Sequence, residues 1–240
     1  MLFTRLAGIS RHLDRMADRV PGTCAVCHAW PSRRVCDACV ARFAQPATRC
    51  ARCALRVPAG VEICGACLRA PPLHDACLAA VDYAYPWADA LAAFKFRGDP
   101  GWARTMASLL RSTPWVEPAL DAGHKVMPVP LSTERLRARG FNQAALLARK
   151  LAPHKADMHS LLRLQSTEAQ SGLARADRLR NLRGAFAVEP ARAGDLRGLR
   201  VVLVDDVMTT GATLHAATQA LRDAGVAHVT AVVLMRTGID

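Results

Sequence analysis

Two adjacent carboxylates, Asp205 and Asp206, stand between a run of four apolar residues and a turn rich in threonine and glycine. The apolar run, 201–204, is typical of a fully buried parallel strand. The segment 214–224 places apolar residues at helical spacing, and Gly225 is suited to end that helix. Open α/β sheets bind ligands where strands give way to such turns, so the two carboxylates are candidate ligand-binding residues.

The turn that follows the carboxylates has the chemistry of a phosphate site. A helix that starts near Thr213 directs free backbone N–H groups and a partial positive charge into the turn. Gly211 lets the backbone approach an anion closely, and threonine hydroxyls add further donors. The carboxylates repel phosphate but accept hydrogen bonds from a diol. The carboxylate pair and the turn together therefore predict a site for ribose 5-phosphate. The predicted contacts are Asp205, Asp206, Thr209, Thr210, Gly211, Ala212 and Thr213.

The alternative to a ligand site is an ordinary buried strand followed by a threonine that caps a helix. Two carboxylates at the end of a buried strand need polar or charged partners, because burying an unpaired charge is costly. A ligand with several hydroxyl groups would supply such partners. We therefore favour the ligand site over the purely structural interpretation.

Three arginines follow a second short strand, which is predicted at 126–130. Arg135, Arg137 and Arg139 stand at every second position, and Gly140 comes directly after them. The forked donors of arginine suit the oxygens of a diphosphate, so a cationic loop with these side chains is predicted to hold one. A solvated helix face is the alternative. Gly140, which disfavours a helix, and the position after a strand weigh against that alternative.

A polar and basic stretch runs from Arg163 to Arg183 and contains glycine. Its composition fits a lid that folds over a ligand, and it fits a disordered surface loop equally well. The candidate lid residues are Thr167, Gln170, Arg178 and Asn181.

Eight of the nine cysteines form four Cys-x-x-Cys pairs in a segment with almost no apolar periodicity. So short a segment builds no core of its own, whereas Zn²⁺ held by four thiolates supplies folding energy. Two structural zinc ions would use all eight cysteines; sequential pairing is preferred, and spacing leaves a cross-braced pairing open. Disulfides or a redox pair fit four consecutive pairs less well. The predicted ligands are Cys24, Cys27, Cys36, Cys39, Cys50, Cys53, Cys64 and Cys67.

Strands alternate with helices in the rest of the chain, which predicts an α/β fold with a mainly parallel sheet flanked by helices. Strands are expected at 81–85, 126–130, 201–204 and 229–235, and helices at 88–96, 102–110, 142–152 and 214–224. Three parts of the chain are expected: an amphipathic helix at 1–20, a double zinc ribbon at 21–70 and the α/β domain at 71–240.

The chain of 240 residues carries a formal net charge of +12, which favours anionic partners such as nucleotides, diphosphates or nucleic acid. No apolar run reaches the length of about eighteen residues that a membrane span needs, and arginines interrupt the amino terminus, unlike in a secretory signal. The apolar stripe on 1–20 is expected to pack on the chain itself or on a second subunit; membrane-surface attachment is less favoured. Cysteines spaced for metal indicate a reducing cytoplasm.

The segment 201–213 resembles the phosphoribosyl-diphosphate-binding motif of type I phosphoribosyltransferases. Four cysteine pairs precede it, followed by Lys95-Phe96-Arg97-Gly98, Pro128-Val129-Pro130, Arg139-Gly140-Phe141-Asn142-Gln143 and the polar segment that begins at Thr167. This order resembles the ComF/GntX family of bacterial phosphoribosyltransferase-like proteins with an amino-terminal double zinc ribbon, over nearly all of 20–237. The best-known members of that family serve uptake of single-stranded DNA in natural competence.

The resemblance implies a type I phosphoribosyltransferase-like fold that binds phosphoribosyl diphosphate with Mg²⁺. Asp205 and Asp206 would hold the ribose hydroxyls, and the turn 209–213 would hold the 5-phosphate. An enzyme of this kind displaces diphosphate at C1, and Asp205, Asp206 and Arg139 would be its catalytic residues. The acceptor, a base or an amine that the sequence does not identify, would stack on aromatic side chains of segment 81–98. These are Tyr83, Tyr85, Phe94 and Phe96.

Two non-enzymatic functions stay open alongside the enzyme. The basic ribbons and helix could contact a phosphodiester backbone, so that the protein binds single-stranded DNA while its pocket senses a nucleotide. Alternatively, the zinc ribbon could be an adaptor for a helicase or another component of an uptake complex. We favour a DNA-associated process served by a phosphoribosyl-binding domain. The oligomeric state, and whether this chain acts in competence, stay open.

Overall fold

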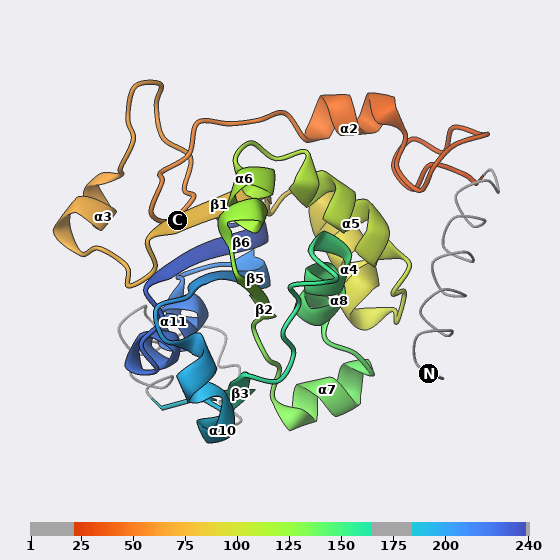
Figure 1. The fold of residues 1–240 in the computed structure, drawn as a ribbon. Helices are drawn as coiled ribbons and strands as arrows, with labels where there is room; N and C mark the ends of the chain where they lie inside the picture. The colour runs from red at the N-terminus through yellow and green to blue at the C-terminus, as the bar shows by residue number, and fades with distance from the viewer. Residues whose placement is uncertain (1–21, 165–183, 239–240) are drawn as a thin grey trace. The chain divides into compact units, whose positions relative to one another are not determined.

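The structure, a computed structural model, describes residues 22–164 and 184–238. The helix expected at 1–20 and the lid residues expected between 165 and 183 lie outside the described residues, so both stay predictions. The chain divides into two compact units, Met1–Gln45 and Pro46–Asp240. Figure 1 labels the elements of both units.

The first unit is built around four cysteines and one short helix. Helix α2 (Asp37–Phe43) begins after Cys36, whose Sγ accepts a hydrogen bond from the backbone N–H of Cys39 at 3.4 Å. Few other side chains are buried in the described part of this unit. The cysteines themselves must therefore organise it, as they do in small metal-dependent domains.

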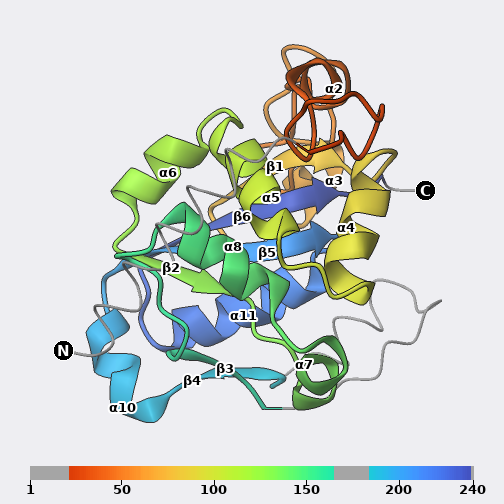
Figure 2. The same cartoon turned by 90° about the vertical axis from the view of Figure 1, so that its right-hand side faces the viewer.

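Four parallel strands form the central sheet of the second unit, in the order β1-β6-β5-β2, which Figure 2 shows. The strands are β1 (Ala76–Asp82), β2 (Lys125–Pro128), β5 (Arg200–Met208) and β6 (His228–Arg236). Most residues of the two inner strands are buried, because helices cover both faces of the sheet. The predicted α/β fold with a parallel sheet is thus confirmed.

The strand that carries the two aspartates is longer than the sequence indicated. β5 continues to Met208 because β6 offers a ladder partner to the end, with Met208 opposite Arg236. The prediction that this strand ends at residue 204 is wrong, and both aspartates belong to the strand itself. The first strand differs for the same reason: it lies at Ala76–Asp82 rather than at 81–85, since its ladder with β6 ends where Asp82 meets Arg236.

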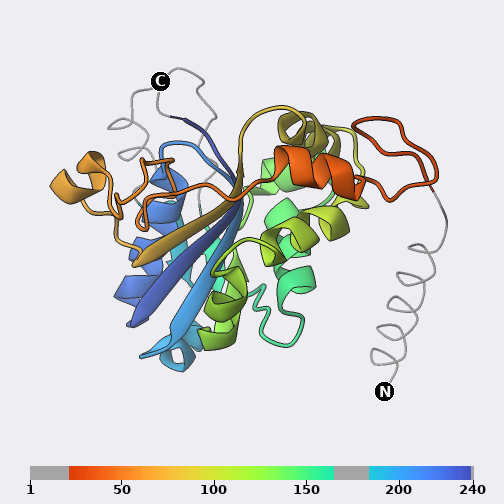
Figure 3. The same cartoon turned by 90° about the horizontal axis from the view of Figure 1, so that it is seen from above.

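Helices cover both faces of the sheet, as Figure 3 shows. Helices α4 (Trp87–Phe96), α5 (Trp102–Arg111) and α8 (Gln143–Leu151) pack on one face, and α11 (Ala212–Asp223) packs on the other. All four lie within two residues of the predicted positions. A further short helix, α6 (Val116–Ala122), follows α5. Among the described residues, no helix is long and apolar enough to cross a membrane.

The three arginines predicted to lie in a loop lie on a helix. Helix α7 (Thr133–Arg139) is capped at its N-terminus by Ser132, whose Oγ accepts a hydrogen bond from the backbone N–H of Arg135 at 3.3 Å. Gly140 ends the helix in the left-handed conformation, with φ of 77°, which glycine adopts without strain. The prediction of a loop is wrong because Gly140 caps this helix rather than preventing it.

A short antiparallel hairpin packs near α11 and consists of β3 (Leu161–Arg163) and β4 (Phe186–Val188). Just beyond β3, the backbone N–H of Leu164 donates to the carbonyl of Ala185 at 2.9 Å. The described residues on either side of the polar segment, Leu164 and Ala185, are therefore neighbours in the hairpin. After the hairpin, α10 (Pro190–Ala193) and a 3-10 turn (Gly194–Leu196) lead to β5.

The second cysteine group packs with the sheet. Its four cysteines share one buried cluster with Cys77 and Ala79 of β1, and helix α3 (Gly65–Arg69) begins between its last two cysteines. The backbone N–H of Cys77 donates to the carbonyl of Ala51 at 2.8 Å. By compactness the chain divides after Gln45, and the boundary expected at residue 70 stays a prediction.

Candidate functional site

Asp206 is held by a lysine from a distant part of the sequence. Its Oδ1 lies 2.7 Å from the Nζ of Lys95, which donates a hydrogen bond and forms an ion pair. Lys95 is in the last turn of α4. Asp206 is 9% exposed, and a carboxylate at that depth requires a charged or polar partner. Lys95 was not among the predicted contacts, although segment 95–98 stands out in the sequence.

Asp205 binds its proton unusually tightly. Burial raises its pKa to about 7, and the neighbouring charge of Asp206 adds to the rise, whereas the positive charges of Lys95 and Arg163 oppose it. Asp205 Oδ1 also accepts a hydrogen bond from the Asp206 backbone N–H at 2.8 Å, which likewise lowers the pKa. The pair thus carries less than two full negative charges at neutral pH. A bound cation would favour its full ionisation.

The turn between β5 and α11 has the geometry of an anion site. Gly211 has a φ of 79°, which favours glycine, and a Cβ there would lie 2.7 Å from the Cε of Met208. Helix α11 starts at Ala212, and its N-cap residue Gly211 has no side chain to cap it; the Ala212 N–H donates to Thr210 Oγ1 at 3.4 Å. The first-turn N–H groups can therefore bind an anion.

Only two of the three predicted arginines share the face of α7 that is partly buried. Arg135 and Arg139 are four residues apart and lie on one face, whereas Arg137 lies on the other side and is exposed. Burial lowers the pKa of Arg139, while the charges of Asp206 and Asp205 raise it. The structure therefore brings Arg139 to the carboxylates and leaves Arg137 in solvent.

The surroundings of Arg139 fix its guanidinium. The group lies over the ring of Phe96, 5.3 Å from the centroid, and donates to Gln143 Oε1 at 3.2 Å. Gln143 is fully buried, and its Nε2 has no hydrogen-bond partner among the described residues. A buried amide without a partner is costly, so a ligand oxygen here would satisfy it.

Arg163, the last residue of β3, is a cation of this site that sequence reasoning missed. Its guanidinium lies 5.1 Å from the ring centroid of Phe186. Burial lowers its pKa and so does the charge of Arg135, while Asp205 raises it. No local pattern marks this residue, because only the hairpin places it near the carboxylates. It stands directly before the segment expected to form the lid.

The aromatic side chains expected to receive an acceptor fall into two groups. Phe94 is fully buried, and its ring centroid lies 5.6 Å from that of Phe141. The expected stacking role of Phe94 is therefore wrong, because this ring belongs to the core. Tyr83, Tyr85 and Phe96 are exposed and stay candidates for contact with a planar ligand.

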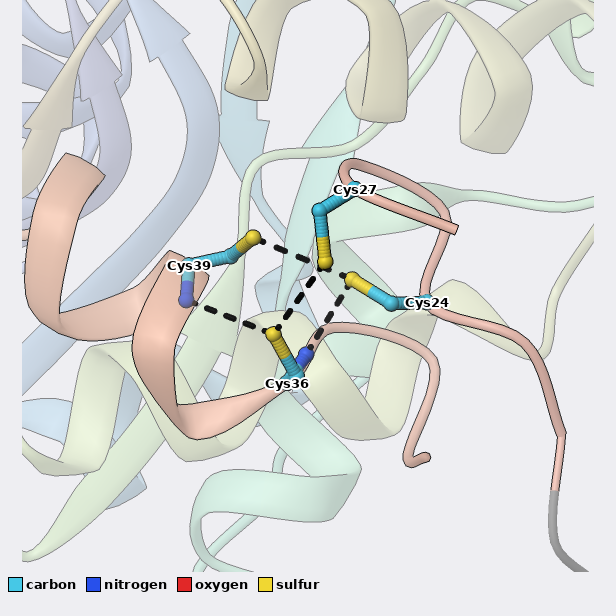
Figure 4. Close-up of side chains that lie close together, drawn as sticks. All are labelled: Cys24, Cys27, Cys36 and Cys39. Carbon is cyan, nitrogen blue, oxygen red and sulfur yellow. Dashed lines mark hydrogen bonds between the residues drawn. The ribbon is translucent and has the colours of Figure 1, made fainter. Parts of the chain in front are cut away.

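The eight predicted metal ligands form two groups that pair sequentially, which excludes the cross-braced alternative. Within each group the four sulfur atoms lie within 4.8 Å of one another, and Figure 4 shows the first group. The sulfurs are 3.9 Å apart in Cys24–Cys39, 3.6 Å in Cys27–Cys36 and 3.7 Å in Cys53–Cys64. Tetrahedral zinc with Zn–S bonds of about 2.3 Å separates its sulfurs by about 3.8 Å, so donors and spacing fit.

Backbone N–H groups point at the first sulfur of each group. Cys24 Sγ accepts from Cys36 at 3.4 Å and from Val26 at 3.5 Å, and Cys50 Sγ accepts from Cys64 at 3.3 Å. Burial alone would raise the pKa of each thiol, but the hydrogen bonds outweigh burial and lower the pKa of Cys24 to about 6 and that of Cys50 to about 7. Burial instead raises the pKa of Cys39, Cys53 and Cys67, so these hydrogen bonds prepare only the first thiol of each group for a metal cation.

Known proteins are similar in sequence to this chain over most of its length. The family model of the phosphoribosyl transferase domain matches residues 138–240. The DNA utilization protein YhgH of Salmonella typhimurium is 32% identical over 232 residues, which cover 91% of this chain and 98% of that protein. Competence protein F of Haemophilus influenzae is 33% identical over 75% of this chain and 81% of its own. Competence protein ComFC of Bacillus subtilis is 36% identical over 62% and 59%, respectively.

Proposed function

The chain belongs to the ComF family of phosphoribosyltransferase-like proteins, and on this premise we propose that it binds phosphoribosyl diphosphate with Mg²⁺ in a DNA-associated process. One observation carries the proposal. The carboxylates of Asp205 and Asp206 lead directly into the Gly211 turn, so acceptors for a diol stand next to backbone donors for a phosphate.

The two halves of the ligand would meet different chemistry in this site. The ribose hydroxyls would donate to Asp205 and Asp206, which lie at the carboxyl end of an inner strand. The 5-phosphate would accept from the turn 209–213, where the N-terminus of α11 adds its partial positive charge. A ligand bound in the opposite orientation would place its phosphate oxygens next to the two carboxylates, where like charges repel.

The diphosphate would lie toward α7 and the start of the polar segment. Arg135 and Arg139 present guanidinium groups on one face of α7, and Arg163 adds a third from β3. Carboxylate oxygens suit Mg²⁺, which neutralises diphosphate charge when it is bound. The candidate lid residues 167, 170, 178 and 181 would then exclude water.

Phosphoribosyl transfer is the reaction that such a site supports. The bond between C1 and the diphosphate oxygen breaks, and the leaving diphosphate keeps the electron pair. A nitrogen of a base or amine forms the new bond to C1 and releases its proton to solvent. Asp205 and Asp206 would orient the ribose, while Arg139 would stabilise charge on the leaving group.

The relatives' names connect this family to DNA, since they include DNA utilization and competence proteins. For this chain we propose a cytoplasmic protein that binds single-stranded DNA and helicase components of a DNA-uptake complex. The net charge of +12 supports an anionic partner. The alternative function is a non-catalytic one, in which the protein binds single-stranded DNA or joins an uptake complex through its zinc ribbons.

Two structural zinc ions complete the proposal. Each group of four cysteines offers the donor set and sulfur spacing of a closed zinc site. Eight free thiols arranged in this way require a reducing compartment, which supports the cytoplasmic location.

Calorimetric titration of the zinc-loaded protein with phosphoribosyl diphosphate tests the function. We expect saturable binding that needs Mg²⁺ and that weakens at least about tenfold in D205N/D206N, which loses charged acceptors for the ribose. Fluorescence anisotropy with a labelled oligothymidine separates the alternative, because a DNA-only protein would bind DNA as well or better in that variant. DNA binding with no heat from phosphoribosyl diphosphate would favour the alternative.

A further inference from the structure

The buried side chain of Arg236, at the end of β6, joins the second cysteine group to the turn proposed to hold the phosphate. Arg236 is 4% exposed. Its Nε donates to the carbonyl of Cys53 at 2.8 Å. Its Nη1 donates to the carbonyl of Thr209 at 2.7 Å and to that of Met208 at 3.2 Å. One guanidinium thus spans a cysteine ligand and the first residues of the turn.

The nearest carboxylate in the ladder does not neutralise this guanidinium. Asp82 stands opposite Arg236 in the sheet, but it forms ion pairs with Arg49, at 2.8 Å, and with Arg56. Both of those arginines are close in sequence to the first cysteines of the second group. Arg236 is therefore held mainly by carbonyl groups, and its planar guanidinium bridges Cys53 and Thr209.

A second contact, between Cys77 and Met208, also joins the buried cluster to the turn. The Sγ of Cys77 lies 3.6 Å from the Sδ of Met208, and both residues share a buried cluster with the second cysteine group. The Cε of Met208 lies directly beneath Gly211, since a Cβ there would be 2.7 Å away. The floor of the turn thus packs against the same cluster that contains the four thiols.

From these contacts we propose that Arg236 is a positioning residue that couples metal occupancy of the second cysteine group to the shape of the turn 208–211. A metal ion fixes the backbone at Cys53, and Arg236 transmits that position to the carbonyls of Met208 and Thr209. The coupling itself needs no ligand; only its consequence for phosphate binding rests on the proposed function. Linkage then requires that a ligand which orders the turn also raises the affinity of this group for zinc.

Hydrogen exchange of the full-length, zinc-loaded protein tests the coupling without any ligand. Arg236→Lys keeps the charge but cannot reach both sets of carbonyls. We expect exchange at 208–212 to become about tenfold faster in this variant, as the loss of hydrogen bonds to a charged group implies. Zinc release from the second group to a chromogenic chelator should also accelerate, while exchange in β2 and α8 stays unchanged.

A pair of cysteine variants supplies the matched control and a second route if Arg236→Lys folds poorly. Cys64→Ser removes a ligand of the second group, and Cys27→Ser removes one of the first group, which lies in the other unit. Exchange at 208–212 should rise in Cys64→Ser and not in Cys27→Ser. Equal exchange at the turn in these two variants, or wild-type exchange and zinc release in Arg236→Lys, would overturn the coupling.

Repeating the zinc measurement in the presence of the ligand separates this inference from the proposed function. With phosphoribosyl diphosphate and Mg²⁺ present, the second group of the wild-type protein should bind zinc several-fold more tightly in a chelator competition, and Arg236→Lys should lose most of that effect. A wild-type protein that binds no phosphoribosyl diphosphate contradicts the proposed function, yet the exchange comparison still decides the coupling. Ligand binding without any change in the zinc affinity of the second group contradicts the coupling alone.

Discussion

Lys95 of α4 and Asp206 of β5 form a nearly buried ion pair across 111 residues of sequence, with Nζ 2.7 Å from Oδ1. Lys95 thereby donates to one of the carboxylate oxygens that would accept a hydrogen bond from a ribose hydroxyl. It compensates the charge of Asp206 in the ligand-free protein and lowers the proton affinity of Asp205. The ligand would share or displace this lysine, so the pair connects the stability of the sheet to the proposed site.

Removing the lysine should destabilise the protein. Lys95→Met leaves Asp206 without its cation, and we expect a loss of about 2 kcal/mol in the free energy of unfolding, below the value for a fully buried pair. Urea denaturation at neutral pH measures it. The double variant K95M/D206N should recover much of the loss, because it removes the unpaired charge as well. Equal stability of Lys95→Met and wild type would contradict a stabilising role of this ion pair.

The raised pKa of Asp205 predicts a pH dependence of stability. Between the ordinary value of 3.8 and about 7, the folded state keeps a proton that the unfolded state has released. The stability that this group contributes is therefore lost as the pH rises through that window. Asp205→Asn removes the dependence, so its melting temperature should exceed that of wild type by a few degrees at pH 8 and match it near about pH 4. A constant difference between the two proteins across this range would count against the shift.

The two faces of α7 predict different effects of arginine substitution. Arg139→Ala should weaken Mg²⁺-dependent binding of phosphoribosyl diphosphate about tenfold or more, because it removes a charge-assisted contact. Arg137→Ala removes the same charge from the exposed face and is the matched control. Calorimetry of both variants provides the test, and similar losses in the two would show that net charge alone matters.

The two cysteine groups predict two zinc ions per chain with unequal structural effects. Loss of the second group should lower the melting temperature of the α/β unit, because its cysteines share the buried cluster of the sheet. Cys27→Ser should lose one zinc ion and leave that transition unchanged. Metal analysis combined with calorimetric melting of Cys27→Ser and Cys64→Ser checks both statements. A melting transition of the α/β unit that shifts equally in both variants would contradict this prediction.

The sequence predicted those features that short segments encode. Cysteine spacing indicated both groups of four, and the apolar run followed by Gly211 indicated the strand, turn and helix. The end of β5 could not be predicted, because the ladder with β6 decides it and that partner lies elsewhere in the sequence. Gly140 was misinterpreted since a glycine that prevents a helix and one that caps it look alike before Ser132 is recognised as the opposite cap.

The missed site residues share a physical cause. Lys95, Arg163 and Arg236 act through contacts with residues far away in the sequence, and each lies at the end of an ordinary helix or strand. Lys95 belongs to the segment 95–98, which stands out in the sequence but does not reveal the partner of the lysine; the local pattern of Arg163 and Arg236 does not distinguish them from surface cations. Only the packing of the sheet reveals that these three are buried or partly buried, and hence that their charges must have partners.

A crystal structure of the zinc-loaded protein with ribose 5-phosphate and Mg²⁺ would show whether a pentose phosphate binds where β5 meets the Gly211 turn. We expect the phosphate to accept hydrogen bonds from the backbone of residues 209–213 and the ribose hydroxyls to donate to Asp205 and Asp206. A ribose 5-phosphate bound away from the Gly211 turn, or a turn that stays empty at saturating ligand, would contradict this expectation.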